Sequence, residues 1–461
     1  MIAASADAKL YPVRWIASAL LLLAATAAAG KIKGKEPGPK AKGKRYEWRA
    51  SNGGLYLYYV PKNYDHEKGA NLVFLLHGSN GSRGWGFGNC PVGAAFRPDD
   101  IIVSPDGSQA NGRGGFNREP SEKELEYLHT LHTDLKKVFK IRQTFLYGHS
   151  QGSYFSHYYA AAYPDEVDGI VAMASGIWEH PDFGKSKHQA IVVMHGTYDP
   201  VVPYGAGVYA YGKCREAGYP KLHFRSLEGW NHWPTDYNSK VPHTAQQLAW
   251  CEGMTTKDMD RLKVSFEFLA TVKAKERHDY AAVYSLASHI ASLEGAPDAL
   301  RKRAERAMKA VDAGARAHIA ALRNIPDPVK FEKKPWVGHL PMFLRAYRGV
   351  PAREEFAKKW EPVVKQHGEA AVPHLRTFFR TKDPVEAFAA GVEAIKVGFF
   401  HYECIAPDNF RTPLRNTRNN KQLKLPKDAL KAYDAIVPDF EKALKDAFRS
   451  FDSVNRKVGK L

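Results

Sequence analysis

The chain has 461 residues, of which 44 % are hydrophobic, 25 % charged and 12 % aromatic. This length gives room for about two to three domains, and the composition excludes a disordered, a collagen-like or a multi-span membrane protein. The net charge of +18 is unevenly distributed, because residues 46–253 carry 19 basic and 21 acidic side chains, whereas residues 254–461 carry 39 and 26. Any anionic partner is therefore expected at the C-terminal half.

The N-terminus has the organisation of a secretory signal peptide. Arg14 precedes an apolar run over residues 15–25, which is followed by the small residues Ala27-Ala28-Ala29. Such a basic, then apolar, then small-residue pattern is cleaved after its last part. We expect cleavage near Ala29, which removes residues 1–29 and makes the mature protein secreted or periplasmic. An uncleaved membrane anchor is the alternative, although the run is shorter than the roughly 20 residues that a span needs.

Residues 30–45 are predicted to be a basic flexible linker. Positions 31–45 hold seven basic residues and one acidic residue, with glycine and proline throughout. A segment of this kind has too little apolar surface to order itself.

Export also affects the interpretation of the cysteines. Disulfides persist in oxidising compartments, so we expect disulfide bonds among the four cysteines, with three pairings open. These are Cys90, Cys214, Cys251 and Cys404. Their spacing contains no Cys-x-x-Cys pair with histidine partners, which argues against a structural zinc site.

Residues 46–253 are predicted to form a doubly wound α/β domain. Short apolar runs alternate with helical stretches and Gly/Pro loops, which is typical of a mostly parallel sheet covered by helices. Strands are predicted at residues 56–60, 72–76, 101–104, 144–147, 169–173, 190–194 and 222–226. Helices are predicted at residues 121–139, after a Ser-x-x-Glu cap, and at about residues 244–251.

Residues 254–461 are predicted to form a mainly α-helical domain of unknown role. Leu262, Phe266 and Leu269 begin a series of apolar residues at helical spacing. Strand signals nearly vanish, and the pattern shows no fixed-period repeat.

The sequence Gly148-His149-Ser150-Gln151-Gly152 lies between a predicted strand and a helix-compatible stretch. This is the strand–turn–helix context of a nucleophile elbow, in which the turn is so sharp that the residues two before and two after the serine must be small. Both positions are glycine here. Ser150 is therefore the predicted nucleophile.

A serine hydroxyl needs a base to accept its proton and an acid to orient that base. Asp199 follows the strand at 190–194, and His232 follows the strand at 222–226. The carboxyl ends of parallel strands meet at one edge of the sheet, so these side chains can reach Ser150. The chain order Ser, Asp, His is that of α/β-hydrolases.

Other polar residues near these motifs are expected to have minor roles. His149 and His195 are expected to position the site residues, and Asp106 is expected to form a turn. Asp165 and Asp168 are expected to be solvated, and no motif surrounds His157 or His188.

An oxyanion hole needs two N–H donors beside the nucleophile. The N–H of Gln151 is one candidate, and the N–H of Ser79 or Gly78 is the other. The glycine-rich residues 84–89 lack the lysine of a phosphate-binding loop and are expected to form a flexible pocket wall. We expect Trp85, His149 and Trp233 to line the substrate pocket.

Together these motifs resemble secreted α/β-hydrolases of the polyhydroxybutyrate depolymerase and feruloyl esterase group, over about residues 46–250. The resemblance implies an α/β-hydrolase fold with Ser150 as nucleophile, Asp199 as acid and His232 as base. Ser153 departs from the group, which often has a second glycine after the elbow, and the G-x-G-H pattern common before its Trp-Pro pair is absent. The helical half is not part of that group's catalytic domain.

The leading hypothesis is a secreted serine hydrolase that cleaves carboxylic esters through an acyl-enzyme, on polysaccharide-linked or polyester substrates, without metal or organic cofactor. One alternative is a peptidase similar to prolyl oligopeptidase. Another is a binding protein whose basic helical half contacts an anionic polymer or envelope surface. Nucleic acid is not an expected partner, because export and the absence of a reading motif argue against it.

Overall fold

The computed structural model describes residues 34–89, 98–197, 199–233, 243–271, 279–322, 340–397 and 408–458. The predicted signal peptide, Cys90 and Cys404 lie outside these ranges. Within them, no helix has both the length and the apolar character that a membrane crossing requires.

An eight-stranded sheet forms the centre of the first half of the chain, in the order β1-β2-β4-β3-β7-β8-β9-β10. The strands are β1 (Arg45–Arg49), β2 (Leu55–Tyr59), β3 (Ala70–Leu76), β4 (Ile101–Pro105), β7 (Ile141–His149), β8 (Gly169–Met173), β9 (Ala190–Gly196) and β10 (Lys221–Leu227). Strands β1 and β2 pair antiparallel, β2 pairs antiparallel with β4, and the remaining neighbours are parallel. A small ribbon joins β5 (Gln109–Ala110) to β6 (Phe116–Asn117). This is the predicted α/β-hydrolase fold, and each predicted strand is present.

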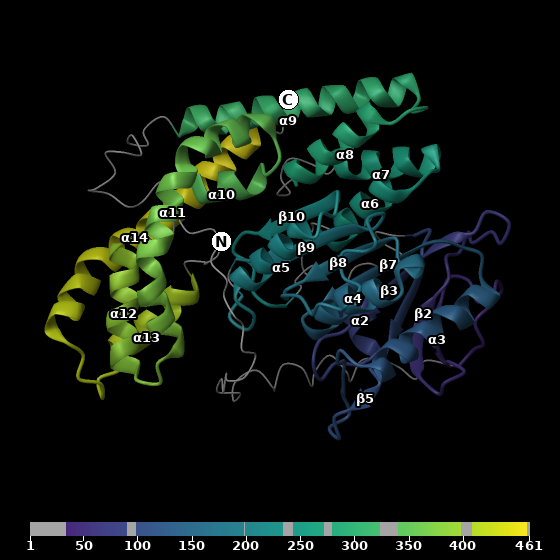
Figure 1. Cartoon of the computed structure of the whole chain (residues 1–461), viewed down its shortest axis with the longest axis horizontal. Helices are drawn as coiled ribbons and strands as arrows, with labels where there is room; N and C mark the ends of the chain where they lie inside the picture. The colour runs from purple at the N-terminus through teal and green to yellow at the C-terminus, as the bar shows by residue number, and fades with distance from the viewer. Residues whose placement is uncertain are drawn as a thin grey trace.

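Helices cover both faces of this sheet (Figure 1). They are α2 (Gly84–Asn89), α3 (Glu122–Val138), α4 (Gln151–Ala162), the 3-10 helix η1 (Pro164–Glu166), α5 (Tyr204–Glu216) and α6 (His243–Thr255). On β3, Val73 and Leu75 belong to one hydrophobic cluster, while Leu72, Phe74 and Leu76 belong to another. Burial on both faces explains why the parallel strands are continuous apolar runs. The glycine-rich residues 84–89, expected to be a flexible wall, instead form helix α2.

The second half of the chain is helical among its described residues. Its helices are α7 (Met259–Thr271), α8 (Tyr280–Ser292), α9 (Asp298–Ala321), α10 (Leu340–Ala346), α11 (Pro351–Arg380), α12 (Pro384–Lys396), α13 (Asp408–Asn419) and α14 (Lys427–Val458). Figure 1 shows α7 and α8 beside α6, whereas α12 and α13 lie away from the sheet.

The hydrophobic core continues from the sheet into these helices. One cluster contains Val192 of β9, Trp250 of α6, Leu286 of α8 and Phe343 of α10. A separate cluster joins α11, α12, α13 and α14. The predicted domain boundary at residue 254 falls within α6, which packs against both the sheet and α7. The division into residues 46–253 and 254–461 stays a prediction, and the core has no break at that point.

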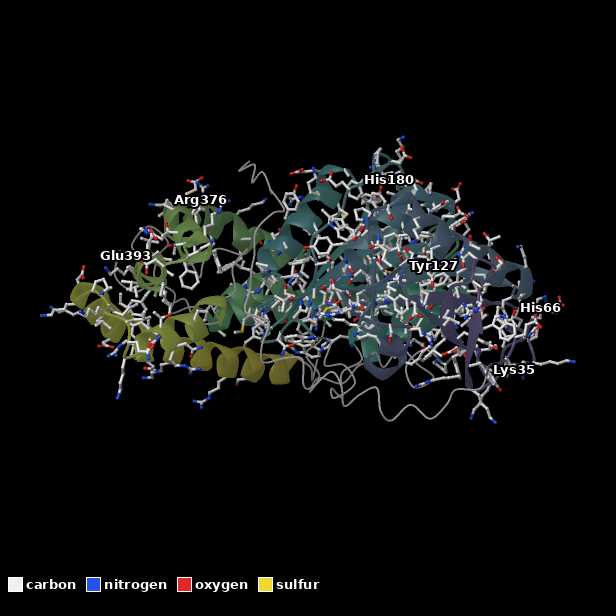
Figure 2. The ribbon with its side chains drawn as sticks, turned by 90° about the horizontal axis from the view of Figure 1, so that it is seen from below. Lys35, His66, Tyr127, His180, Arg376 and Glu393 are labelled. Carbon is white, nitrogen blue, oxygen red and sulfur yellow. The ribbon has the colours of Figure 1, made fainter. Side chains whose placement is uncertain are left out.

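The segment expected to be a flexible linker is ordered over its described part. Gly34 forms a bridge with Glu47, Lys42 forms one with Val60, and the Ala41 side chain is 1 % exposed. Tyr58 donates a hydrogen bond of 2.8 Å from its hydroxyl to the carbonyl of Lys35. Backbone hydrogen bonds to β1 and β2 hold the segment in place, which composition alone does not reveal. Figure 2 shows Lys35 at the opposite end of the molecule from Arg376 and Glu393.

The disulfide expectation is wrong for the two cysteines that the structure describes. Cys214 in α5 and Cys251 in α6 are both buried thiols rather than halves of a disulfide. Burial raises the pKa of the Cys214 thiol to about 12. The Cys251 thiol donates to the carbonyls of Ile170 and Ala190, at 3.7 and 3.8 Å. Both thiols therefore pack as small apolar groups.

Candidate active site

Ser150 lies at a sharp turn between β7 and α4. Its backbone has φ 52° and ψ −119°, a left-handed conformation that residues other than glycine rarely adopt. Such a conformation costs about 1–3 kcal/mol and persists only where the surrounding structure enforces it. Here the Ser150 N–H donates to the carbonyl of Met173 at 2.9 Å. The turn has the geometry of a nucleophile elbow.

The glycines on either side of Ser150 are required by close backbone contacts. A Cβ on Gly152 would lie 2.3 Å from the carbonyl oxygen of Leu76, at the end of β3. A Cβ on Gly148 would lie 2.4 Å from the carbonyl oxygen of Gly152. These distances are far below van der Waals contact, so a side chain at either position would displace the start of α4.

Asp199 is a buried carboxylate on the loop after β9. Its Oδ1 accepts hydrogen bonds from the N–H groups of Val201 and Val202, both at 2.8 Å. Its Oδ2 lies 2.8 Å from His232 Nδ1 and 3.3 Å from His195 Nε2. Burial alone raises the pKa of Asp199, but hydrogen bonds from His195 and His232 outweigh it and hold the pKa well below its usual range. The side chain is therefore negatively charged at neutral pH.

His232 lies on the loop after β10 and is buried. Because a carboxylate only accepts, the His232 Nδ1–H donates to Asp199, which leaves Nε2 free of its proton in the neutral ring. The ring centre lies 4.8 Å from that of His149, the residue before Ser150. Within the described residues, Ser150 Oγ has no hydrogen bond to His232. Such bonds are often long before substrate binds.

His149, the histidine inside the elbow, contacts His232. Its Nε2–H donates to the carbonyl of His232 at 2.8 Å. Burial and the neighbouring His232 ring lower the pKa of His149 to about 3, so the ring stays neutral. Trp85 of α2 stacks on this ring, with centres 5.2 Å apart, and also on Tyr147. The Trp85 ring is thus positioned by packing beside the elbow.

The candidates for the oxyanion hole lie close to Ser150. Gln151 is the first residue of α4, so its N–H is at the positive end of the helix dipole. A Cβ on Gly78 would lie 3.1 Å from Ser150 Cβ, which places the Gly78 backbone against the nucleophile. Ser79 follows and is exposed. His77, whose pKa is lowered to about 3 by burial and by Arg118, donates from Nδ1 to the Gly78 carbonyl at 2.8 Å.

Arg118 is a site-supporting residue that the sequence analysis did not identify. Its side chain is fully buried and pairs with Glu124 at 2.6 Å. Its Nη2 donates to the carbonyls of Pro105 and Asp106, and its backbone N–H donates to Gln151 Oε1 at 2.9 Å. Arg118 thus fixes the Gln151 side chain from the position directly after the two-residue strand β6, and no short motif marks that position.

Most of the competing residues are occupied elsewhere. Asp106 pairs with Arg83 at 2.6 Å, and Asp165 and His188 are exposed. His157 is buried in α4. Asp168 was expected to be solvated. It instead lies directly before β8, and its carboxylate accepts a hydrogen bond of 2.8 Å from the N–H of Thr144 in β7.

Ser153 stands where the resembled group often has a second glycine, and here its side chain makes a hydrogen bond. Its hydroxyl lies 2.5 Å from the Ser175 hydroxyl, which in turn donates to the carbonyl of Gly176 at 3.0 Å. Between β8 and Ser175, Ala174 has φ 57°. The serine thus links the first turn of α4 to the chain after β8.

Ser150, Asp199 and His232 follow the carboxyl ends of β7, β9 and β10, and Asp199 contacts His232 directly. In the part of the chain that the structure describes, no group of three or more His, Cys, Asp or Glu side chains is arranged to hold a metal ion. The three residue types, with the 2.8 Å contact between Asp199 and His232, are those used where an imidazole and a carboxylate activate a serine.

A protein-family model matches the part of the chain that contains the candidate site. Residues 117–238 match the phospholipase/carboxylesterase family model. This stretch contains Ser150, Asp199 and His232.

Several solved structures are similar to part of the chain. A thermostable esterase is 19 % identical, with a TM-score of 0.34, over 49 % of this chain and 62 % of that one. The feruloyl esterase module from Clostridium thermocellum, complexed with sinapinate, is 15 % identical, with a TM-score of 0.33, over 43 % and 84 %. Est1E from Butyrivibrio proteoclasticus, with ferulic acid bound, is 16 % identical, with a TM-score of 0.33, over 43 % and 95 %. The chain thus spans less than two thirds of the first of these structures.

Proposed function

We propose that this chain is a serine hydrolase of carboxylic esters. The observation that carries the proposal is the 2.8 Å hydrogen bond between Asp199 and His232, beside the strained turn at Ser150. Nucleophile, base and acid each have the residue type and the surroundings that acyl transfer requires.

The proposed reaction has two halves. Ser150 Oγ attacks the ester carbonyl carbon while His232 Nε2 takes the hydroxyl proton. The oxygen of the tetrahedral intermediate accepts hydrogen bonds from the N–H of Gln151 and from that of Gly78 or Ser79. His232 then protonates the leaving alcohol. Water, deprotonated by His232, releases the acid and restores Ser150.

The electrostatics of the site suit this cycle. The low pKa of Asp199 keeps it charged, and that charge stabilises the imidazolium that forms on His232. The neutral His149 adds no competing positive charge beside that ring. The His149 ring therefore takes up no proton at neutral pH.

We infer that the acyl group is aromatic. Trp233 is 40 % exposed and meets the His232 ring edge-on, with centres 5.6 Å apart. Trp85 stacks on His149, the residue before Ser150. An exposed indole beside His232 and a second indole beside the elbow suit a flat ring. An exported enzyme of this kind would act on aromatic esters attached to polysaccharides, and polyesters are the alternative substrate.

The test is a panel of substrates given to the mature protein: short-chain aryl esters, feruloyl and acetyl sugar esters, a polyhydroxybutyrate suspension, and peptide anilides. Ester turnover that Ser150→Ala abolishes supports the proposal. Ser285→Ala, in α8, is the matched control and should retain activity. Turnover of anilides alone would indicate a peptidase. If nothing is hydrolysed and a fluorophosphonate does not label Ser150, the proposal is wrong.

A further inference from the structure

The loop that carries His232 is held by the helical half of the chain. Glu228 begins this loop, directly after β10. Arg345 of α10 makes a bidentate contact with the Glu228 carboxylate: Nε lies 2.5 Å from Oε1, and Nη2 lies 2.9 Å from Oε2. The two side chains are 7 % and 13 % exposed. A bidentate Arg–carboxylate pair that is largely shielded from water fixes both the distance between the two side chains and their relative orientation.

The same arginine also lies next to the acid side of the site. Its guanidinium group is 5.9 Å from the ring centre of Tyr204. The Tyr204 ring meets that of His195 edge-on at 5.8 Å, and His195 contacts Asp199. Arg345 therefore contacts the His232 loop directly, and two residues, Tyr204 and His195, connect it to Asp199.

On its other side, the His232 loop lies against the end of β9. The Gly229 N–H donates to Thr197 Oγ1 at 2.9 Å, and the Thr197 N–H donates to the carbonyl of Leu227 at 3.0 Å. A Cβ on Gly196 would lie 2.3 Å from the carbonyl oxygen of Trp230, so the two backbones are already in contact. The loop thus lies between β9 and the arginine of α10.

The middle of strand β10 is also anchored by the helical half. Asp279, which caps α8, accepts hydrogen bonds from His223 Nε2 at 2.7 Å and from Gln247 Nε2 at 2.8 Å. The Arg348 guanidinium group lies 5.3 Å from the ring centre of Phe224. Because His223 and Phe224 belong to β10, the strand and the loop after it have a common support outside the sheet.

We propose that Arg345 is a positioning residue for the hydrolysis: through Glu228 it holds the loop in the place where His232 can keep its hydrogen bond to Asp199. The inference rests on the proposed function, and it gives the helical half a part in catalysis. A misplacement of about 1 Å in a catalytic group can cost on the order of 100-fold in rate. Loss of the ion pair should therefore lower kcat while KM changes little.

The experiment compares two arginines that join the helical half to the sheet. Arg345→Met removes the charge at the His232 loop. Arg261→Met is the matched control, because Arg261 of α7 lies 2.7 Å from Glu252, at 15 % and 1 % exposure. Glu252 also accepts a hydrogen bond from Asn71 at the start of β3. The site follows the opposite, carboxyl ends of the parallel strands. Both variants should lower the Tm. Only Arg345→Met should lower kcat, by about 10- to 100-fold.

Glu228→Gln is the second variant, in case Arg345→Met fails to fold. It should lower kcat by a similar factor, because both changes break the same ion pair, and the loss of kcat in the double variant should be smaller than the product of the two single losses. Wild-type kcat in Arg345→Met or Glu228→Gln would overturn the inference, as would an equal loss of kcat in Arg261→Met.

A measurement without substrate separates this inference from the proposed function. The His232 Nδ1 proton bound to Asp199 should give a far-downfield proton NMR signal, assigned by its disappearance in His232→Ala. The signal should shift or broaden in Arg345→Met and stay in place in Arg261→Met. If the wild type hydrolyses no ester, the proposed function fails, and this signal still decides whether Arg345 holds the loop.

Discussion

Replacing Asp199 with asparagine should remove most of the activity by reversing the tautomer of His232. The reason lies in how the carboxylate is held. Oδ1 accepts two backbone N–H groups, from Val201 and Val202. An amide NH₂ cannot accept hydrogen bonds, so the asparagine must place its carbonyl oxygen there. Its NH₂ group then takes the position of Oδ2.

That position faces His232 Nδ1 at 2.8 Å and His195 Nε2 at 3.3 Å. His232 Nδ1 donates to the carboxylate in the wild type, so an NH₂ group at this position would oppose that donor, and it would also face His195 Nε2, which donates to the carbonyl of Val202 at 3.0 Å. His232 relieves the conflict by moving its proton from Nδ1 to Nε2. The Nε2 lone pair, which takes the proton of Ser150, is then lost.

A base held in the wrong tautomer costs about 10⁴-fold in kcat. This corresponds to about 5 kcal/mol of transition-state stabilisation. The assay is kcat for the best ester substrate of the wild type, with circular dichroism to show that the variant is folded. A loss below tenfold would refute the tautomer argument.

The control for this variant is Asp106→Asn. Asp106 is also a buried aspartate after a strand, and it accepts a backbone N–H of Arg83 at 2.7 Å together with its guanidinium group at 2.6 Å. Its substitution should lower stability and leave kcat within a few-fold of the wild type. If both variants lose activity equally, loss of a buried carboxylate explains the result and the tautomer does not.

Burial lowers the pKa of His157 to about 4, below the ordinary 6.5, so the unfolded chain binds more protons and stability falls as pH drops from 6.5 to 4. His157→Leu should flatten that decline by about 1 kcal/mol per pH unit in urea titrations, whereas Phe155→Leu should shift the curve without changing its slope. Gly152→Ala should destabilise by about 1–3 kcal/mol and remove activity, whereas Gly212→Ala, with open space around it, should be neutral or stabilising in thermal unfolding. Trp233→Ala should raise KM about tenfold for feruloyl esters and much less for acetyl esters in steady-state assays.

The parts of the site that the sequence predicts are those encoded by local motifs. The elbow around Ser150 needs glycine at two fixed positions, and Asp199 and His232 directly follow apolar strands. The sheet was predictable for the same reason, because strands buried on both faces have continuous apolar runs.

The contacts that the sequence does not predict join distant segments. Arg345 is 117 residues from Glu228, and neither belongs to a motif. In the sequence, nothing distinguishes Arg118 from a solvent-exposed arginine, and its role depends on its burial in the fold. The disulfide prediction is wrong for Cys214 and Cys251, because an oxidising compartment permits disulfides, whereas pairing depends on which side chains the fold brings together.

The uninterrupted core has a consequence for how this protein can be divided. Trp250 of α6 shares one cluster with Val192 of the sheet and Leu286 of α8. A fragment that ends at residue 253 would present the outer face of α6 to water, with large apolar side chains no longer covered. Such a fragment should aggregate on expression, whereas limited proteolysis of the whole chain should leave the two halves associated. We therefore expect the helical half to keep the hydrolase half soluble by covering the apolar outer face of α6.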